Sequence, residues 1–131
     1  MNVNVPFFIF SAEKPEYDGS VNAQRTDFCR RHLEHNNIGY TPVHGVWQSH
    51  DESATIAWAY DIDHTRDVVE RLARRYGQTA ILEVDANRHA CLIYIHSGVI
   101  EEIGQWHEIS AATAVTLSSY TITPDGRYWT A

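Results

Sequence analysis

Glu52 is the residue best placed to do chemistry, because its carboxylate lies between two segments that alternate like β-strands. Trp47 precedes it and Trp58 follows it. Aromatic faces attract cations, so a carboxylate between indoles is typical of a site for a cationic, ring-bearing ligand. A glutamate in a solvated turn explains the same residues, and this segment alone favours that simpler interpretation.

Four further residues belong to the same set of acids, aromatics and polar groups. Glu83 interrupts the apolar run ILEVD, so its carboxylate either faces solvent or points into a polar pocket. Asn22 and Arg25 are three residues apart and share one face near a helix N-terminus, where an anion can bind. An ordinary exposed first turn is the simpler interpretation of that pair. Tyr40 completes the set.

Other kinds of site have little support in the sequence. The eight histidines include His32 and His35 on one helix face, but neither HExxH nor a Cys/His pattern of zinc spacing occurs. The seven glycines form no phosphate-binding loop, and no GxSxG motif is present. We therefore expect no metal, no cofactor and no covalent catalysis.

Length and charge set the class of protein. The 131 residues, 44% of them hydrophobic, predict one domain over residues 1–131. A net charge of −7 argues against binding to nucleic acid or to an anionic membrane, whereas the ten interspersed Lys and Arg argue against a DNA mimic. The N-terminal segment lacks a basic region, and Cys29 and Cys91 favour free, buried thiols. We expect a cytoplasmic protein without a membrane span.

Hydrophobic periodicity predicts two helices among several strands. Helices are expected at residues 20–35, capped by Ser20, and from Asp63 or Thr65 to residue 76. Strands are expected at residues 5–12, 41–48, 54–60, 78–85, 89–96, 99–103, 120–123 and 127–130, with a polar turn at 49–53.

This order predicts an α+β fold. The succession β-α-β-β-α-β with extra terminal strands is typical of a ferredoxin-like two-layer sandwich, with both helices on one face of an antiparallel sheet. The other face carries Trp58, Leu92 and Tyr94 and would be exposed in a lone subunit. We therefore expect a homo-oligomer.

Five short motifs in the same order resemble one family. They are Ser11-Ala12, the pair Asn22 and Arg25, the segment 43–47 followed by Glu52, the segment 90–94, and a C-terminal pattern of Tyr120-Thr121-Ile122, Gly126-Arg127 and Trp129. Together they span nearly the whole chain. On these residues the chain resembles the S-adenosylmethionine (SAM) lyases of bacteriophages, formerly described as SAM hydrolases.

The resemblance implies a ferredoxin-like subunit, a PII-like homotrimer and ligand sites between subunits. It implies cleavage of SAM to 5′-methylthioadenosine and homoserine lactone, which depletes SAM and counters host restriction and methylation. Glu52 would orient the substrate, and Tyr40 and Trp47 would wall the site. Glu83 matches no acid of the family pattern, and we expect it to contribute to substrate binding because of its place in the apolar run ILEVD. Asn22 and Arg25 would either bind the substrate or brace the sheet.

Three alternatives stay open. A hydrolase would give homoserine rather than its lactone. A PII-like sensor with the same predicted fold would bind an adenine nucleotide or SAM and leave it intact. A structural or interaction domain would do neither.

Overall fold

The computed structural model describes residues 5–131. It contains nine strands and three helices in that range: β1 (Phe7–Phe10), α1 (Gly19–His35), β2 (Tyr40–Trp47), β3 (His50–Trp58), α2 (Ile62–Arg75), β4 (Ala80–Val84), β5 (His89–Tyr94), β6 (Ile100–Gln105), β7 (His107–Ile109), α3 (Ala111–Ala114), β8 (Tyr120–Ile122) and β9 (Tyr128–Thr130). No helix among these residues is long and apolar enough to cross a membrane.

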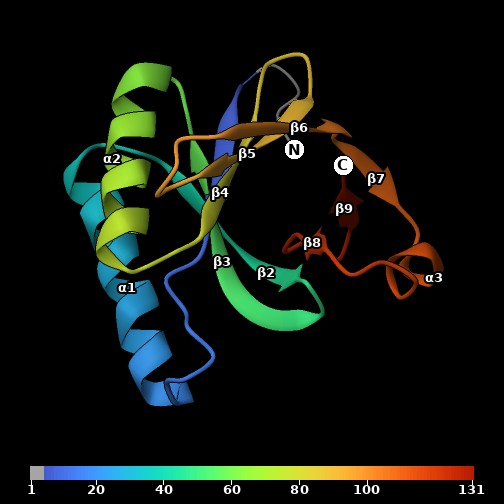
Figure 1. Ribbon diagram of the computed structural model, residues 1–131, viewed down its shortest axis with the longest axis horizontal. Helices are drawn as coiled ribbons and strands as arrows, with labels where there is room; N and C mark the ends of the chain where they lie inside the picture. Colours follow the sequence, from blue (N-terminus) through green and yellow to red (C-terminus); the bar gives the residue numbers. More distant parts are fainter. Residues whose placement is uncertain (1–4) are drawn as a thin grey trace.

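All nine strands form one antiparallel sheet in the order β6-β5-β4-β1-β3-β2-β8-β9-β7. Strands β6 and β7 lie at opposite ends of this order, yet Trp106 alone separates them along the chain. The sheet must therefore curl until its two edges approach each other. Figure 1 shows the result, a nearly closed barrel with the helices outside it.

The predicted two-layer ferredoxin-like sandwich is therefore wrong. The first six elements follow the expected order, but β7, β8 and β9 extend the sheet beyond β2 and fold back across its second face. A second core forms inside the barrel, where Phe7 and Ile56 pack with Trp106. Leu92 and Trp58, expected on an exposed face, are buried and half-buried. The chain itself thus supplies cover that the sandwich would have needed from another subunit.

Helices α1 and α2 pack together on the outer side of the sheet (Figure 1). Asp18 caps α1 by accepting a hydrogen bond from the Val21 amide, and Asp61 caps α2 in the same way. Both caps lie two residues or more before the predicted starts. The outer core joins Leu33 of α1 and Val69 of α2 to the sheet.

The hairpin between β2 and β3 is tighter than predicted. Its turn consists of Gln48 and Ser49 alone, with φ values of 47° and 67°. Positive φ at both central residues is typical of a two-residue turn that matches the twist of a hairpin. The predicted turn at 49–53 is therefore wrong, and Glu52 lies within β3, paired with Gly45.

Candidate active site

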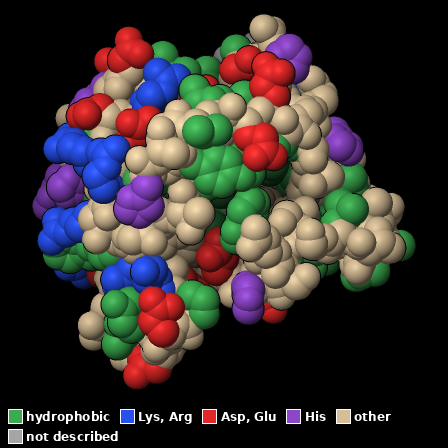
Figure 2. All heavy atoms as spheres, viewed as in Figure 1, with side chains coloured by type: hydrophobic (Ala, Val, Ile, Leu, Met, Phe, Trp, Pro, Cys, Tyr) green, Lys and Arg blue, Asp and Glu red, His purple; other side chains and the backbone are tan. Residues whose placement is uncertain are grey.

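The barrel interior contains a cavity of about 350 Å³, in the range of roughly 300–1,000 Å³ that is usual for small-molecule sites. Seen along the view of Figure 1, the surface is hollowed near its centre, with hydrophobic and acidic side chains beside the recess (Figure 2). The aromatic lining residues are Phe10, Trp47, Trp106, Tyr120 and Trp129, and the charged or titratable ones include Glu13, Lys14, His50 and Glu52.

Strand alternation points Glu52 into this cavity. Residues of β3 two apart share a face, so Glu52 lies on the same side as Ala54, which also lines the cavity. Its cross-strand partner is Gly45, where an added Cβ would meet the Glu52 Cγ at 3.5 Å. The absence of a side chain at Gly45 leaves the space over the Glu52 stem open.

Burial and a second carboxylate make Glu52 unusually basic. The pKa of Glu52 rises from 4.5 to about 7, mainly because burial removes hydration and to a smaller extent because of the negative charge of Glu13. The polar Ser11 hydroxyl and the nearby His44 lower the pKa of Glu52, but by less. Near neutral pH the carboxyl is thus divided between both protonation states, and a bound cation would favour its charged form.

Aromatic rings form another part of the wall. The Trp106 and Trp129 rings lie 6.2 Å apart between centroids and within 3° of parallel. Outside the lining, Phe7 packs edge-on against Trp106 at 5.6 Å and against Trp58 at 5.3 Å between ring centroids. The Trp129 Nε1 donates to the Thr123 Oγ1 at 3.0 Å, which fixes the indole. The cavity therefore offers flat apolar surfaces suited to a ring-bearing ligand.

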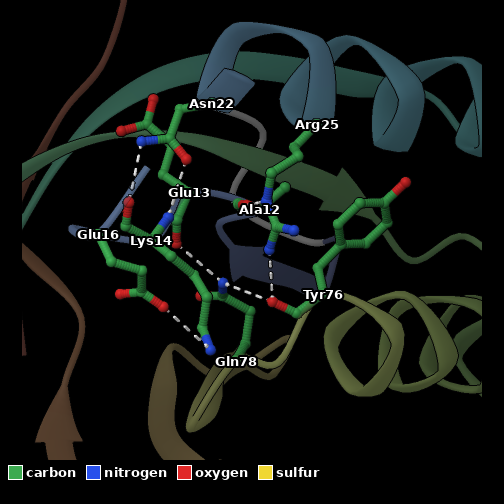
Figure 3. Close-up of polar contacts among 8 residues, drawn as sticks. All are labelled: Ala12, Glu13, Lys14, Glu16, Asn22, Arg25, Tyr76 and Gln78. Carbon is green, nitrogen blue, oxygen red and sulfur yellow. Dashed lines mark hydrogen bonds and ion pairs between the residues drawn. The ribbon is translucent and has the colours of Figure 1, made fainter. Parts of the chain in front are cut away.

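Asn22 and Arg25 brace the loop between β1 and α1 (Figure 3). The Asn22 amide accepts from the Lys14 backbone N and donates to the Lys14 carbonyl, both at 3.0 Å. Arg25 donates to the Ala12 carbonyl at 2.6 Å and to the Tyr76 carbonyl at 2.7 Å. These bonds position the loop, whose residues Glu13 and Lys14 line the cavity.

Three more hydrogen bonds, involving Gln78 and Ser11, hold the same loop. The Gln78 Nε2 donates to the Glu13 carbonyl at 3.0 Å. The Ser11 hydroxyl donates to the Ser53 carbonyl at 2.9 Å and accepts from the Glu13 amide at 3.0 Å. Glu13 is thus joined through Ser11 to the residue that follows Glu52.

Tyr40 and Glu83 lie away from the cavity, toward the helices. The Tyr40 hydroxyl donates to the Glu34 carboxylate at 2.7 Å. Glu83 accepts two hydrogen bonds from Arg66, the shorter at 2.6 Å. The structure therefore brings Glu52 and Trp47 together at the cavity, whereas substrate contacts by Tyr40 and Glu83 stay a prediction.

A comparison with known families identifies the chain. A family model described as the S-adenosylmethionine lyase family matches residues 8–131. The chain belongs to the S-adenosylmethionine lyase family. It is accordingly an enzyme, a lyase that acts on SAM. A search of curated proteins found no match.

Sequence reasoning missed several residues that line the cavity of this SAM lyase. Glu13 and Lys14 lie in a segment with the composition of an ordinary loop, and Trp106 lies in a segment without clear periodicity. A signal did exist for Tyr120 and Trp129, because both belong to the C-terminal motif that carried the resemblance. The C-terminal motif therefore contributes two residues to the cavity wall.

Residues 5–131 of the lyase contain no cluster of three or more His, Cys, Asp or Glu that could hold a metal ion. Both cysteines are free thiols. Cys29 is buried in the outer core, and burial raises its pKa to about 12. A thiol so rarely ionised is a poor nucleophile.

Proposed function

We propose that the enzyme cleaves SAM to 5′-methylthioadenosine and L-homoserine lactone by intramolecular displacement. A carboxylate oxygen of the substrate attacks its own γ-carbon, and the bond from that carbon to the sulfonium sulfur breaks. The electron pair of the broken bond stays on sulfur, which leaves as a neutral thioether. Neither water nor a protein nucleophile is consumed, and no proton needs to move.

The observation that carries this proposal is the half-buried carboxylate of Glu52 in an aromatic-walled cavity. Intramolecular alignment of this kind can contribute about 7–11 kcal/mol to lowering a barrier. Opposite charges are neutralised as the lactone forms, so a site that excludes water favours the transition state over the solvated zwitterion. Trp106 and Trp129 supply such apolar surface.

Glu52 acts in this scheme as an ionised group that orients the substrate through its ammonium. In this role the Glu52 carboxylate forms no covalent bond with the substrate. Because its pKa is about 7 in the free protein, kcat/KM should rise as pH increases through 7. Bound substrate, being cationic, should shift the midpoint for kcat to lower pH.

Chromatography of SAM incubated with the wild type and with Glu52→Gln tests the proposal. The wild type should yield methylthioadenosine with the lactone, and Glu52→Gln should lower kcat/KM by about 30- to 5,000-fold, which corresponds to the roughly 2–5 kcal/mol lost when one partner of a buried charge pair is removed. Asp51→Asn is the matched control, because Asp51 is the exposed neighbour that pairs with His44 at 3.2 Å. It should keep nearly full activity.

Three other outcomes of this experiment would each support a different function or a different essential residue. Early appearance of homoserine without lactone would mean that water attacks, and that the enzyme is a hydrolase. Intact SAM in the wild type would favour a PII-like sensor. Full cleavage by Glu52→Gln would keep the lyase but move the essential group to another residue, with Glu83 the next to test.

We further propose a phage setting, in which the enzyme works in the host cytoplasm as a homotrimer with sites between subunits. Loss of SAM there would deprive host restriction and methylation of their cofactor. The family resemblance supports this setting. Expression of the wild type, but not of Glu52→Gln, should lower the SAM content of a bacterial cell.

A further inference from the structure

Glu13 introduces a second negative charge into the cavity, and the mechanism above does not use it. Glu13 belongs to the cavity lining together with Glu52, and its negative charge acts on the Glu52 carboxyl. Gln78 and Ser11 bind its backbone carbonyl and amide, so the loop presents Glu13 from a fixed position. A fixed carboxylate beside a ligand cavity contributes to the choice of ligand charge.

Positive charge near the cavity is sparse. Lys14 is the one Lys or Arg in the lining, and its Nζ pairs with Glu16 at 3.5 Å. Seven of the ten Lys and Arg residues lie in the two long helices outside the barrel. The remaining titratable side chains of the lining are His50, Glu52 and Tyr120. The cavity is thus predominantly anionic.

We propose that Glu13 is a specificity-determining residue, which makes the cavity selective for a ligand that carries both a sulfonium and an ammonium. This inference rests on the proposed function, because SAM carries these two cations. S-adenosylhomocysteine has a neutral thioether and should bind less well. The product methylthioadenosine is also a neutral thioether, so the same charge favours its release.

Calorimetric titration with two uncleaved ligands tests the selectivity. Sinefungin carries an amine in place of the sulfonium, whereas S-adenosylhomocysteine is neutral at that position. At pH 8, Glu13→Gln should weaken sinefungin binding about tenfold and change S-adenosylhomocysteine binding less than about twofold. Glu13→Asp, which keeps the charge, should keep the discrimination. Asp67→Asn is the control and should change neither affinity, because Asp67 is exposed on α2, lies outside the cavity lining and pairs with Arg71 at 3.1 Å.

Kinetics give a second readout that a merely structural role would not move. Glu13→Gln should raise KM for SAM about tenfold while kcat stays within about threefold. It should also move the midpoint of kcat/KM to lower pH, because Glu13 raises the pKa of Glu52.

Equal weakening of both ligands by Glu13→Gln would overturn the inference, since Glu13 would then only shape the loop. Unchanged binding of both ligands would overturn it as well. The proposed cleavage fails separately: a wild type that binds sinefungin with the expected selectivity but leaves SAM intact would refute the lyase chemistry alone. Cleavage of SAM with no effect of Glu13→Gln would refute the selectivity alone.

Discussion

Glu52 lowers the stability of the folded protein in the same ionised form that the proposed activity requires. A carboxylate must be charged to orient a cation, and a charged carboxylate is costly to bury. The pKa of Glu52 in the folded protein, about 7, lies above the ordinary value of 4.5. Below pH 4.5 the Glu52 carboxyl is protonated in both the folded and the unfolded protein, so its burial there costs no charge. This advantage is lost as pH rises through 7, where the folded protein holds a half-buried negative charge.

Glu52→Gln should therefore be more stable than the wild type at pH 8. The difference in free energy of unfolding should grow between pH 4.5 and 7 and reach about 1–3 kcal/mol, after allowance for partial exposure of the carboxyl. Urea unfolding of both proteins at pH 5 and pH 8 measures it. A difference that does not change with pH would contradict the assigned burial of the charge, and Asp51→Asn should show no such trend.

The site residues could be predicted in part, and the failures have a geometric cause. Glu52 stood out because tryptophans flank it on both sides. Tyr40 and Trp47 are seven residues apart in one strand, an odd number that places them on opposite faces. Strand alternation is thus at odds with the expectation that both residues wall one cavity, and it does not tell which face lines the cavity. Glu13 gave no such signal, because its loop is positioned by distant residues.

At the scale of elements, the loop between β1 and α1 depends on Arg25. The guanidinium binds two backbone carbonyls and lies 4.8 Å from the ring centroids of both Tyr17 and Tyr76. Arg25→Ala should lower the free energy of unfolding by about 2–3 kcal/mol, because two carbonyls lose charged donors. It should also raise KM for SAM, since the loop carries Glu13. Urea unfolding and steady-state kinetics measure the two effects.

Arg31→Ala is the matched control on the same helix, because Arg31 is exposed and pairs only with Asp27 at 3.0 Å among the described contacts. Its cost should stay below about 0.5 kcal/mol. Loss of activity in Arg25→Ala without loss of stability would support direct substrate binding by Arg25 instead of a brace.

Elements with strong local signals were predicted well, and weak ones were not. Helix α2 has an apolar face and a clear end at Gly77, whose φ is +67°. The predicted bounds of α1 were also close, although Asn22 and Thr26 share its buried side with Cys29 and Leu33. Residues 104–114 gave no pattern because they hold β7 and α3, of three and four residues. So few residues complete neither a convincing alternation nor a helical period.

The closure of the barrel could not be predicted, because it depends on contacts between distant parts of the chain. Trp106 and Trp129 meet across the interior, and an added Cβ at Gly104 would come within 3.5 Å of Ala131. The element order up to β4 is shared with a flat two-layer sandwich, so local patterns cannot tell the two apart. The barrel can be distinguished from the sandwich only when the positions of β7, β8 and β9 in the sheet are known.

At the scale of the whole molecule, the homotrimer remains a prediction. Closure of the barrel removes part of the reason for expecting it. The barrel covers much of the face that had suggested an oligomer. The exposed large hydrophobic residues are scattered: they include Ile100 at the free edge of β6, which is 64% exposed, Val115 after α3, which is 77% exposed, and Tyr60 after β3, which is 78% exposed. An edge strand with an exposed apolar side chain is a natural place for another chain to pair.

Light scattering should therefore give three times the 15.0 kDa subunit mass. Ile100→Lys should lower that mass, because a charge on an edge opposes pairing. Ile100 does not line the cavity, so the activity of the separated Ile100→Lys subunit shows whether the site needs a second subunit. If sites lie between subunits, Ile100→Lys should lose activity while its urea midpoint stays near that of the wild type. A 15.0 kDa wild type with full activity would refute the trimer, and a mass lowered only by Val115→Lys would move the interface to α3.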